Sequence, residues 1–205
     1  MIVSTLVLDC DGVIRHWDRD QFAAVAQLAG CDPRALAEIA FDPDLLGPAM
    51  VGDRTAEAWA EEIGRRVGAA HGVDAAVVAE RFLALGWRID DEVVGIARQV
   101  RASGHRVAIL SNATTRLEAD LASEGLTDEV DVVLSSARLG LAKPDPAIYR
   151  AAADALGVGP EACVFIDDRA DNVDGARVAG MVAEVFSGAG PLAQLLGELG
   201  LLESA

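Results

Sequence analysis

Short runs of apolar residues recur along the chain and predict the strands of a buried sheet. Five such runs cover residues 2–8, 107–110, 132–134, 163–166 and 182–186. Each run is almost continuous, without the alternation of a half-exposed strand, which is typical of strands covered on both faces of a parallel sheet. Helical patterns separate the later runs, over residues 91–103, 114–124, 146–156 and 172–179, and a glycine follows each. This alternation predicts an α/β fold with right-handed crossovers, and a weaker pattern over residues 191–201 predicts a last helix.

The segment from about residue 15 to residue 85 differs, because it contains no convincing strand pattern. Its periodicity predicts helices over residues 20–28, 33–40, 55–67 and 74–85. A helical block between the first strand and the rest is typical of an insertion that folds over one end of a sheet, where it can exclude water and select the substrate. We therefore expect a catalytic core of residues 1–14 and 86–205 and a helical cap of residues 15–85.

Composition and charge narrow the possible functions. The net charge of −16 argues against nucleic acid as a partner, because phosphate backbones are bound by clustered lysine and arginine. The N-terminal apolar run has no preceding basic region and is broken by Asp9 and Asp11, so it predicts neither a signal peptide nor a membrane span. Cys10, Cys31 and Cys163 are too few and too scattered for a disulfide framework or a zinc site. We expect a cytoplasmic protein with reduced cysteines and no membrane partner.

The strongest chemical feature is the stretch Asp9-Cys10-Asp11-Gly12 at the end of the first apolar run. Side chains two positions apart on an extended chain point the same way, so Asp9 and Asp11 can share one ligand. A bound divalent cation would relieve the repulsion between them, and oxygen-only ligands favour magnesium over zinc. A strand that ends in an Asp-Gly turn explains the motif equally well when it is taken alone.

Polar residues also follow three of the later strands. They are Ser111 and Asn112, Lys143 at the start of a loop with two prolines (Pro144 and Pro146), and Asp167 with Asp168. A helix N-cap, an exposed lysine and a capped helix would explain each group separately. Ligands of open parallel sheets bind beyond the carboxyl ends of the strands, however, and all of these groups are expected at that edge. Their coincidence favours one functional site.

The order Asp-x-Asp-Gly, Ser-Asn, Lys-Pro and Asp-Asp resembles the four motifs of the haloacid-dehalogenase-like (HAD) hydrolases. The insertion after the first motif resembles the helical C1-type cap of subfamily IA. The stretch from Phe165 to Asn172, with Gly175 and Ala176, is most similar to sugar-phosphate phosphatases and to epoxide-hydrolase-associated phosphatase domains. The resemblance implies a Rossmann-like three-layer core, with a five-stranded parallel sheet of order 3-2-1-4-5, plus an inserted α-helical cap.

The same resemblance implies the catalytic and metal-binding roles. Asp9 would be the nucleophile that forms an aspartyl-phosphate, and Asp11 would protonate the leaving group and then activate water. Magnesium would be held by the carboxylates of Asp9 and Asp168 and by the backbone carbonyl of Asp11, with Asp167 bound to the metal or beside it.

The resemblance also implies a set of residues that bind the substrate. Ser111 and the amide of Asn112 would bind phosphoryl oxygens, and Lys143 would stabilise the nucleophile and the transferring group. Gly12 belongs to the same set, and Arg54 in the predicted cap is a further candidate.

The function implied is that of a magnesium-dependent phosphatase of a small phosphorylated metabolite, such as a sugar phosphate, in a monomer or homodimer. A sugar phosphomutase stays open, because Arg54, Arg65 or Arg66 of the cap could grip a second phosphate. A haloacid dehalogenase is disfavoured, since such enzymes lack the second aspartate, here Asp11, and need no metal. A catalytically silent binding protein is disfavoured because no motif residue is lost. An unrelated nucleotide-binding protein is disfavoured because the chain has no phosphate-binding glycine loop.

Overall fold

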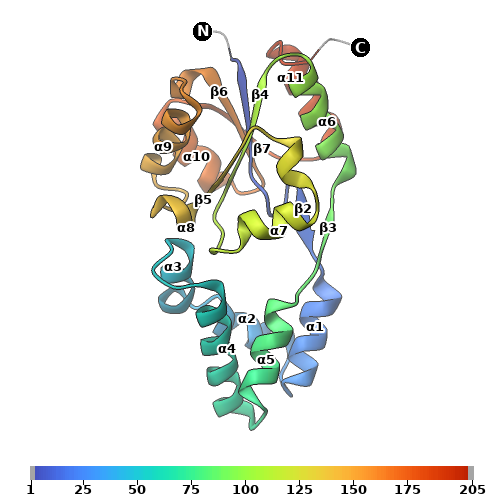
Figure 1. Cartoon of the computed structure of the whole chain (residues 1–205), viewed down its shortest axis with the longest axis vertical. Coiled ribbons are helices and arrows are strands. Elements are labelled where there is room, and N and C mark those ends of the chain that lie inside the picture. The colour runs from blue at the N-terminus through green and yellow to red at the C-terminus, as the bar shows by residue number, and fades with distance from the viewer. Residues whose placement is uncertain (1–2, 203–205) are drawn as a thin grey trace.

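The computed structural model describes residues 3–202, which form an α/β core and a lobe of helices at one end of it (Figure 1). Five parallel strands make the core sheet, in the order β5-β4-β1-β6-β7. Counted among the core strands alone this is 3-2-1-4-5, so the predicted fold class is confirmed. The strands are β1 (Thr5–Leu8), β4 (Arg106–Ser111), β5 (Val132–Ser135), β6 (Cys163–Asp167) and β7 (Val182–Val185). Ile2, which belongs to the first predicted strand, lies outside the described residues.

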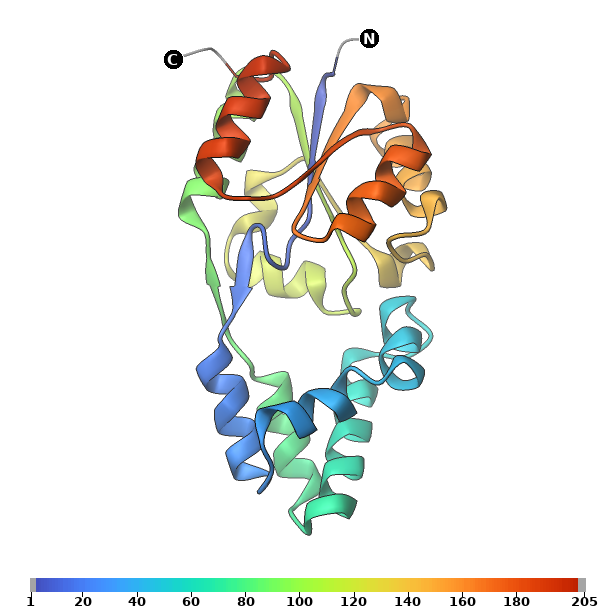
Figure 2. The ribbon, with the colours of Figure 1, turned by 180° about the vertical axis from the view of Figure 1, so that it is seen from behind.

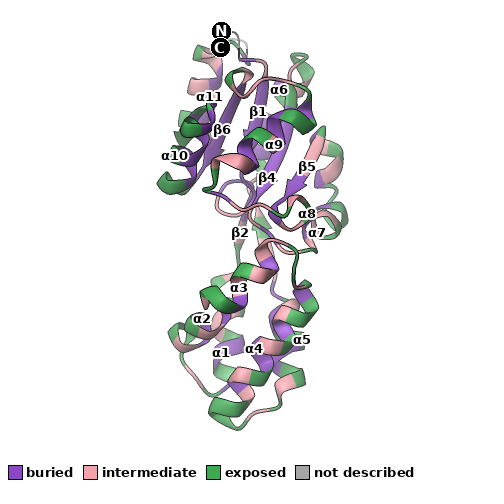
Figure 3. Cartoon of the chain, turned by 90° about the vertical axis from the view of Figure 1, so that its left-hand side faces the viewer, coloured by how far each residue is buried: buried purple, intermediate pink, exposed green. Residues whose placement is uncertain are grey.

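Side chains of the central strands alternate between two hydrophobic clusters, one on each face of the sheet. Leu6 and Leu8 face helices α6 (Asp91–Ala102), α7 (Leu117–Ser123) and α11 (Ala189–Glu198). Val7 faces α9 (Pro146–Leu156) and α10 (Ala170–Ala179). These two helices cover the other side of the sheet (Figures 1 and 2). All three side chains are fully buried, which explains why the strand sequence is continuously apolar (Figure 3). The remaining core elements are α8 (Ser136–Leu139) and the short 3₁₀ helices Leu126–Glu129 and Pro160–Ala162.

The register of the sheet aligns the strand ends that carry the predicted motifs. Leu8 of β1 lies opposite Ile109 of β4 and Ile166 of β6. Asp9 and Asp167 are the next residues of their strands, so they emerge side by side at the same edge.

Two chain crossings between core and lobe form a short antiparallel ribbon that the sequence did not predict. Strand β2 (Arg15–Trp17) pairs with β3 (Trp87–Ile89), with Trp17 opposite Trp87. We expected no strand in residues 15–85, and this expectation is wrong for the first three residues of that segment, which form β2. Three residues are too few to display an alternating pattern, and the partner strand lies far away in the sequence.

The lobe consists of five helices with a hydrophobic cluster of their own. They are α1 (Arg19–Leu28), α2 (Pro33–Ala40), α3 (Pro43–Met50), α4 (Ala56–His71) and α5 (Ala75–Leu83). An aspartate or threonine side chain caps the N-terminus of each helix, as Asp32 does for α2. Helix α3 was not predicted, because Gly47 and Pro48 interrupt its pattern. That this lobe acts as a cap stays a prediction. Within residues 3–202, no helix has the length and apolar character that a membrane span requires.

Candidate active site

A cavity of about 870 Å³ lies between the carboxyl edge of the sheet and the helical lobe. Most of the predicted site residues contribute to its core wall, namely Asp9, Asp11, Ser111, Asn112, Lys143 and Asp168. Hydrogen bonds join the two walls, since the Arg116 guanidinium donates to Leu83 O at 3.2 Å and the Ala56 amide donates to the Thr115 hydroxyl at 3.2 Å. We call this space the chamber.

Lys143 lies at the floor of the chamber between two carboxylates. Its Nζ is 2.7 Å from Asp9 Oδ1 and 2.6 Å from Asp167 Oδ2, and it donates a hydrogen bond to Leu110 O at 3.1 Å. Only 1% of the side chain is exposed, and a buried cation is stable only when it is paired in this way. Burial alone would lower the pKa of Lys143, but Asp9 and Asp167 outweigh it, raise the pKa and keep the amine charged. Lys143 is also the one lysine of the chain, beside sixteen arginines.

Asp9 is buried beside this lysine. Burial raises its pKa to about 6, with Asp167 adding to the rise and Lys143 opposing it. No described residue donates a hydrogen bond to the buried Oδ1, whose contact with Lys143 is an ion pair. Burial thus destabilises this carboxylate, and a bound cation would stabilise its charged form.

Three carboxylates converge at this point with the chemistry of a divalent-cation site. Asp9, Asp167 and Asp168 each offer an oxygen, and the three atoms lie within 4.8 Å of one another. Oxygen ligands without histidine or cysteine suit a hard cation such as Mg²⁺. Burial and the neighbouring Asp167 raise the pKa of Asp168, so a cation would stabilise its charged form as well. The residues present therefore fit the metal that the sequence predicted.

Gly12 makes room for one of these carboxylates. Its φ of +96° lies in the left-handed region, and a Cβ at this position would collide with the Asp168 carboxylate. Gly12 is not among the residues that line the chamber. The role of Gly12 in substrate binding stays a prediction, and the structure shows that the missing side chain leaves space for the Asp168 carboxylate.

Asn112 is in the site, but its side chain serves the loop of Lys143. Its Oδ1 accepts from the Lys143 amide and its Nδ2 donates to the Lys143 carbonyl, both at 2.8 Å. Helix α7 begins only at Leu117, so the expected helix N-terminus does not follow Ser111 directly. Ser111, which is buried at the end of β4, lines the chamber.

Asn172 is a site residue that sequence reasoning left without a role. Its Nδ2 lies 3.0 Å from each oxygen of Asp167, and its carbonyl accepts from the Tyr149 hydroxyl at 2.6 Å. The Arg169 amide also donates to Asp167 at 2.9 Å, so this carboxylate is held from several directions. The available signal was the spacing of Asn172 behind the Asp-Asp pair, on the first turn of α10.

Asp11 does not join the three converging carboxylates, but pairs with Arg15. Arg15 Nε lies 2.5 Å from Asp11 Oδ1, and Nη2 lies 3.1 Å from Oδ2. The buried guanidinium lies over the rings of Trp17 and Trp87, 4.9 and 4.7 Å from their centroids. The two-stranded ribbon thus holds Asp11, whose side chain still faces the chamber.

The predicted arginines of the lobe lie elsewhere. Arg54 donates to Leu45 O at 3.1 Å, and it does not line the chamber. Arg65 and Arg66 pair with Glu62 on the surface of α4. The structure therefore does not bring Arg54 to the substrate position, because the α3–α4 turn directs it back to its own lobe.

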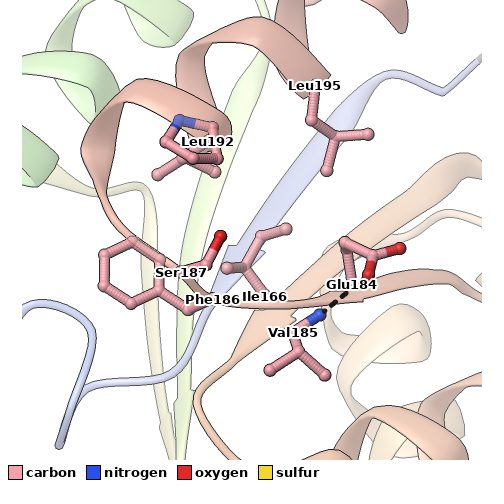
Figure 4. A pocket seen from close by; sticks show the side chains of 8 residues that line it. Ile166, Glu184, Val185, Phe186, Ser187, Leu192 and Leu195 are labelled. Carbon is pink, nitrogen blue, oxygen red and sulfur yellow. Dashed lines mark hydrogen bonds between the residues drawn. The ribbon is translucent and has the colours of Figure 1, made fainter.

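A second, much smaller cavity of about 50 Å³ lies between the end of β7 and α11 (Figure 4). Apolar side chains make up most of its lining, and Glu184 Oε1 accepts from the Val185 amide at 3.4 Å. We attribute it to imperfect packing of the last helix.

Comparisons with known proteins agree with this geometry. The family model of the haloacid dehalogenase-like hydrolases matches residues 3–180. Phosphatase MT3486 of Mycobacterium tuberculosis is 47% identical over 94 residues, or 45% of this chain and 43% of that protein. The (S)-2-haloacid dehalogenase 4A of Burkholderia cepacia is 39% identical over 79 residues, or 38% of this chain and 34% of that protein. The match spans less than half the length of either relative.

A solved structure shows the same fold over most of the chain. It is a HAD family enzyme of Bacteroides thetaiotaomicron in complex with magnesium and inorganic phosphate, with a TM-score of 0.73 and 20% identity. The match covers 90% of this chain and 94% of that one. The family model, matched over most of the sequence, shows that the chain belongs to the haloacid dehalogenase-like hydrolases.

Proposed function

We propose that this protein is a magnesium-dependent phosphatase that hydrolyses a small phosphate monoester through an aspartyl-phosphate on Asp9. One observation carries the proposal. The ammonium group of Lys143 lies 2.7 Å from Asp9 at the floor of the chamber, and the cluster of Asp9, Asp167 and Asp168 lies beside it. The named phosphatase among the relatives supports the same activity.

In this mechanism the Asp9 carboxylate attacks phosphorus, and the bond to the leaving oxygen breaks. Asp11 donates a proton to that oxygen, which leaves as an alcohol. Asp11 then takes a proton from water, whose oxygen attacks the phosphorus of the aspartyl-phosphate and releases inorganic phosphate and free Asp9. Ser111 donates a hydrogen bond to a phosphoryl oxygen, and Lys143 offsets the negative charge that Asp9 and the phosphoryl group bring together.

The three carboxylates have two different roles, because some would bind the metal and one holds Lys143 in place. Asp167 accepts hydrogen bonds from Asn172, Lys143 and the Arg169 amide, so its oxygens are already used. Asp9 and Asp168 are the more available ligands, and we assign Asp167 to holding Lys143. Bound Mg²⁺ would offset the charge of the phosphoryl oxygens and orient them toward Asp9. The helical lobe would close over this end as a cap and exclude water.

Two alternatives lose support. A phosphomutase needs basic residues for a second phosphate, and the predicted Arg54, Arg65 and Arg66 do not line the chamber, which leaves Arg19 of α1 as the arginine of the lobe helices that does. Asp11, which a dehalogenase would not need, faces the chamber two residues from the nucleophile. The sugar phosphate, the cytoplasmic location and the monomer or homodimer expected from the sequence stay predictions.

A panel of phosphate esters, assayed for phosphate release with Mg²⁺ and with a chelator, tests the proposal. We expect release that requires Mg²⁺ and disappears in Asp9→Asn. Asp174→Asn, which makes the same change on the exposed face of α10, should keep the activity. Release that persists with the chelator or in Asp9→Asn would overturn the proposal.

A further inference from the structure

The aromatic residues of this chain gather around the chamber. The sequence has three tryptophans and five phenylalanines. All three tryptophans line the chamber, as do three of the phenylalanines, namely Trp17, Trp59, Trp87, Phe22, Phe41 and Phe82. The two clusters of the core domain are mainly aliphatic. Phe82, Phe22 and Trp59 also pack in the cluster of the lobe, so these rings both fill that cluster and line the chamber.

Four of these rings form one continuous surface on the helical lobe, which we call the aromatic wall. Phe22 stacks on Phe41 with centroids 6.2 Å apart and meets Phe82 at 6.3 Å, and Trp59 meets Phe82 edge-on at 5.1 Å. The indole nitrogen of Trp59 donates to Ala40 O at 3.1 Å, so its polar atom is used within the lobe. The wall presents ring faces and edges, which bind apolar and aromatic groups.

Charged groups of the lobe are scarce in the chamber. Between Trp17 and Trp87, the lining residues with charged side chains are Asp18 and Arg19. The Asp18 carboxylate accepts from the amides of Asp20 and Gln21, at 2.9 and 3.0 Å, and thereby caps α1. On the core side, Arg116 is bonded to Leu83 O and paired with Asp120. A sugar held against the aromatic wall would bury hydroxyl groups on that side with few partners to replace water.

We propose that the substrate is a phosphate monoester whose alcohol part is apolar and carries an aromatic ring, and not a sugar phosphate. This inference rests on the proposed function, since it places the phosphate at Asp9 and Lys143 and the ring against the aromatic wall. A chamber of about 870 Å³ is within the range of roughly 300–1,000 Å³ that holds ligands of this size. The polar groups at the core end of the chamber suit the phosphate of such an ester, and the aromatic wall at the lobe end suits its ring.

The test compares benzyl phosphate with glucose 6-phosphate as substrates in the presence of Mg²⁺. We expect a preference for benzyl phosphate in kcat/KM of about a hundredfold, within the range that an apolar pocket provides. Phe41→Asn should reduce this preference about tenfold. Phe41 is 51% exposed, so the substitution leaves the fold intact. Leu28→Asn is the matched control, because Leu28 is 46% exposed on the same lobe but does not line the chamber.

A second measurement separates this inference from the proposed function. Calorimetric titration of the magnesium-loaded protein with benzylphosphonate and methylphosphonate, which cannot be hydrolysed, reports the contribution of the ring alone. Tighter binding of benzylphosphonate supports the inference even if no ester is hydrolysed. The absence of hydrolysis would overturn only the proposed phosphatase activity. Equal binding of the two phosphonates, or glucose 6-phosphate turned over as well as benzyl phosphate, would overturn the inference and leave the phosphatase standing.

Discussion

The side chain of Asn112 and the backbone of Lys143 hold each other through two reciprocal hydrogen bonds, both 2.8 Å long. The amide of one residue thereby fixes the loop from which the other sends its ammonium group to Asp9. Because these residues end two different strand–loop segments, the contact also locks the spacing of the two motifs. Groups that orient a catalytic residue in this way contribute to the rate without touching the reacting atoms.

Asn112→Ala removes both hydrogen bonds and should lower kcat by about ten- to a hundredfold. The free energy of unfolding should fall by only about 1–2 kcal/mol, since two ordinary hydrogen bonds are lost. Steady-state kinetics and urea unfolding measure the two effects. Gln194→Ala removes a side-chain amide hydrogen bond on α11, and this control should leave kcat unchanged. Unchanged kcat in Asn112→Ala would show that Lys143 does not depend on this contact.

Lys143→Met leaves the carboxylates of Asp9 and Asp167 buried without their cation. Breaking a buried ion pair from one side costs roughly 3–5 kcal/mol, and we expect a loss of that order in unfolding free energy, together with loss of activity. The double variant Lys143→Met/Asp167→Asn should regain part of the stability, because one uncompensated charge is gone, but none of the activity. A double variant no more stable than the single one would contradict this account of the pairing.

The raised pKa of Asp9 has a defined effect on the metal-free protein. The pKa lies at about 6 when folded, against an ordinary 3.8, so the folded state binds the proton more tightly. This contribution to stability is complete below about pH 4 and is lost as the pH rises through 6, by up to about 3 kcal/mol. Urea unfolding with a chelator, from pH 4.5 to 7.5, measures it as the difference between the wild type and Asp9→Asn. A difference that does not change with pH would contradict the assigned burial of Asp9.

Gly12→Ala should weaken Mg²⁺ binding about tenfold or more, because the new methyl group displaces the Asp168 carboxylate. The φ of +96° adds backbone strain of roughly 1–2 kcal/mol. Gly104→Ala is the matched control, since Gly104 has a similar φ of +86° with open space around it. Magnesium titration of both variants by calorimetry separates the two effects. Equal magnesium affinity in the two variants would show that Gly12 does not position Asp168.

The strand-end motifs were predictable because parallel strands deliver their carboxyl ends to one edge whatever the details of packing. This argument placed Asp9, Lys143 and Asp168 together without knowledge of any contact. Arg54 of the helical lobe lies outside this reasoning, because its direction depends on how the turn after α3 leaves the helix. The reciprocal bonds between the Asn112 side chain and the Lys143 backbone could not be predicted, since they depend on the path of a loop.

The ribbon and the chamber wall could not be inferred from local patterns. Arg15 is buried between Trp17 and Trp87, which meet only because two short strands pair across the whole helical insertion. The residues of the aromatic wall are likewise spread over several helices. In its own stretch of sequence, each of them has the pattern of an ordinary core residue. The sequence does contain one signal for Lys143. A single lysine beside sixteen arginines indicates a position where a guanidinium group cannot replace the ammonium group.

The central claim is that Asp9 carries the phosphoryl group during turnover. The most direct measurement mixes the magnesium-loaded protein with excess benzyl phosphate or another hydrolysed ester, stops the reaction with acid within milliseconds, and locates any added mass by peptide mass spectrometry. We predict one phosphoryl group on the peptide that contains Asp9, absent in Asp9→Asn and without the ester. Phosphate release by an Asp9→Asn protein, or a phosphoryl group on another residue, would contradict the account.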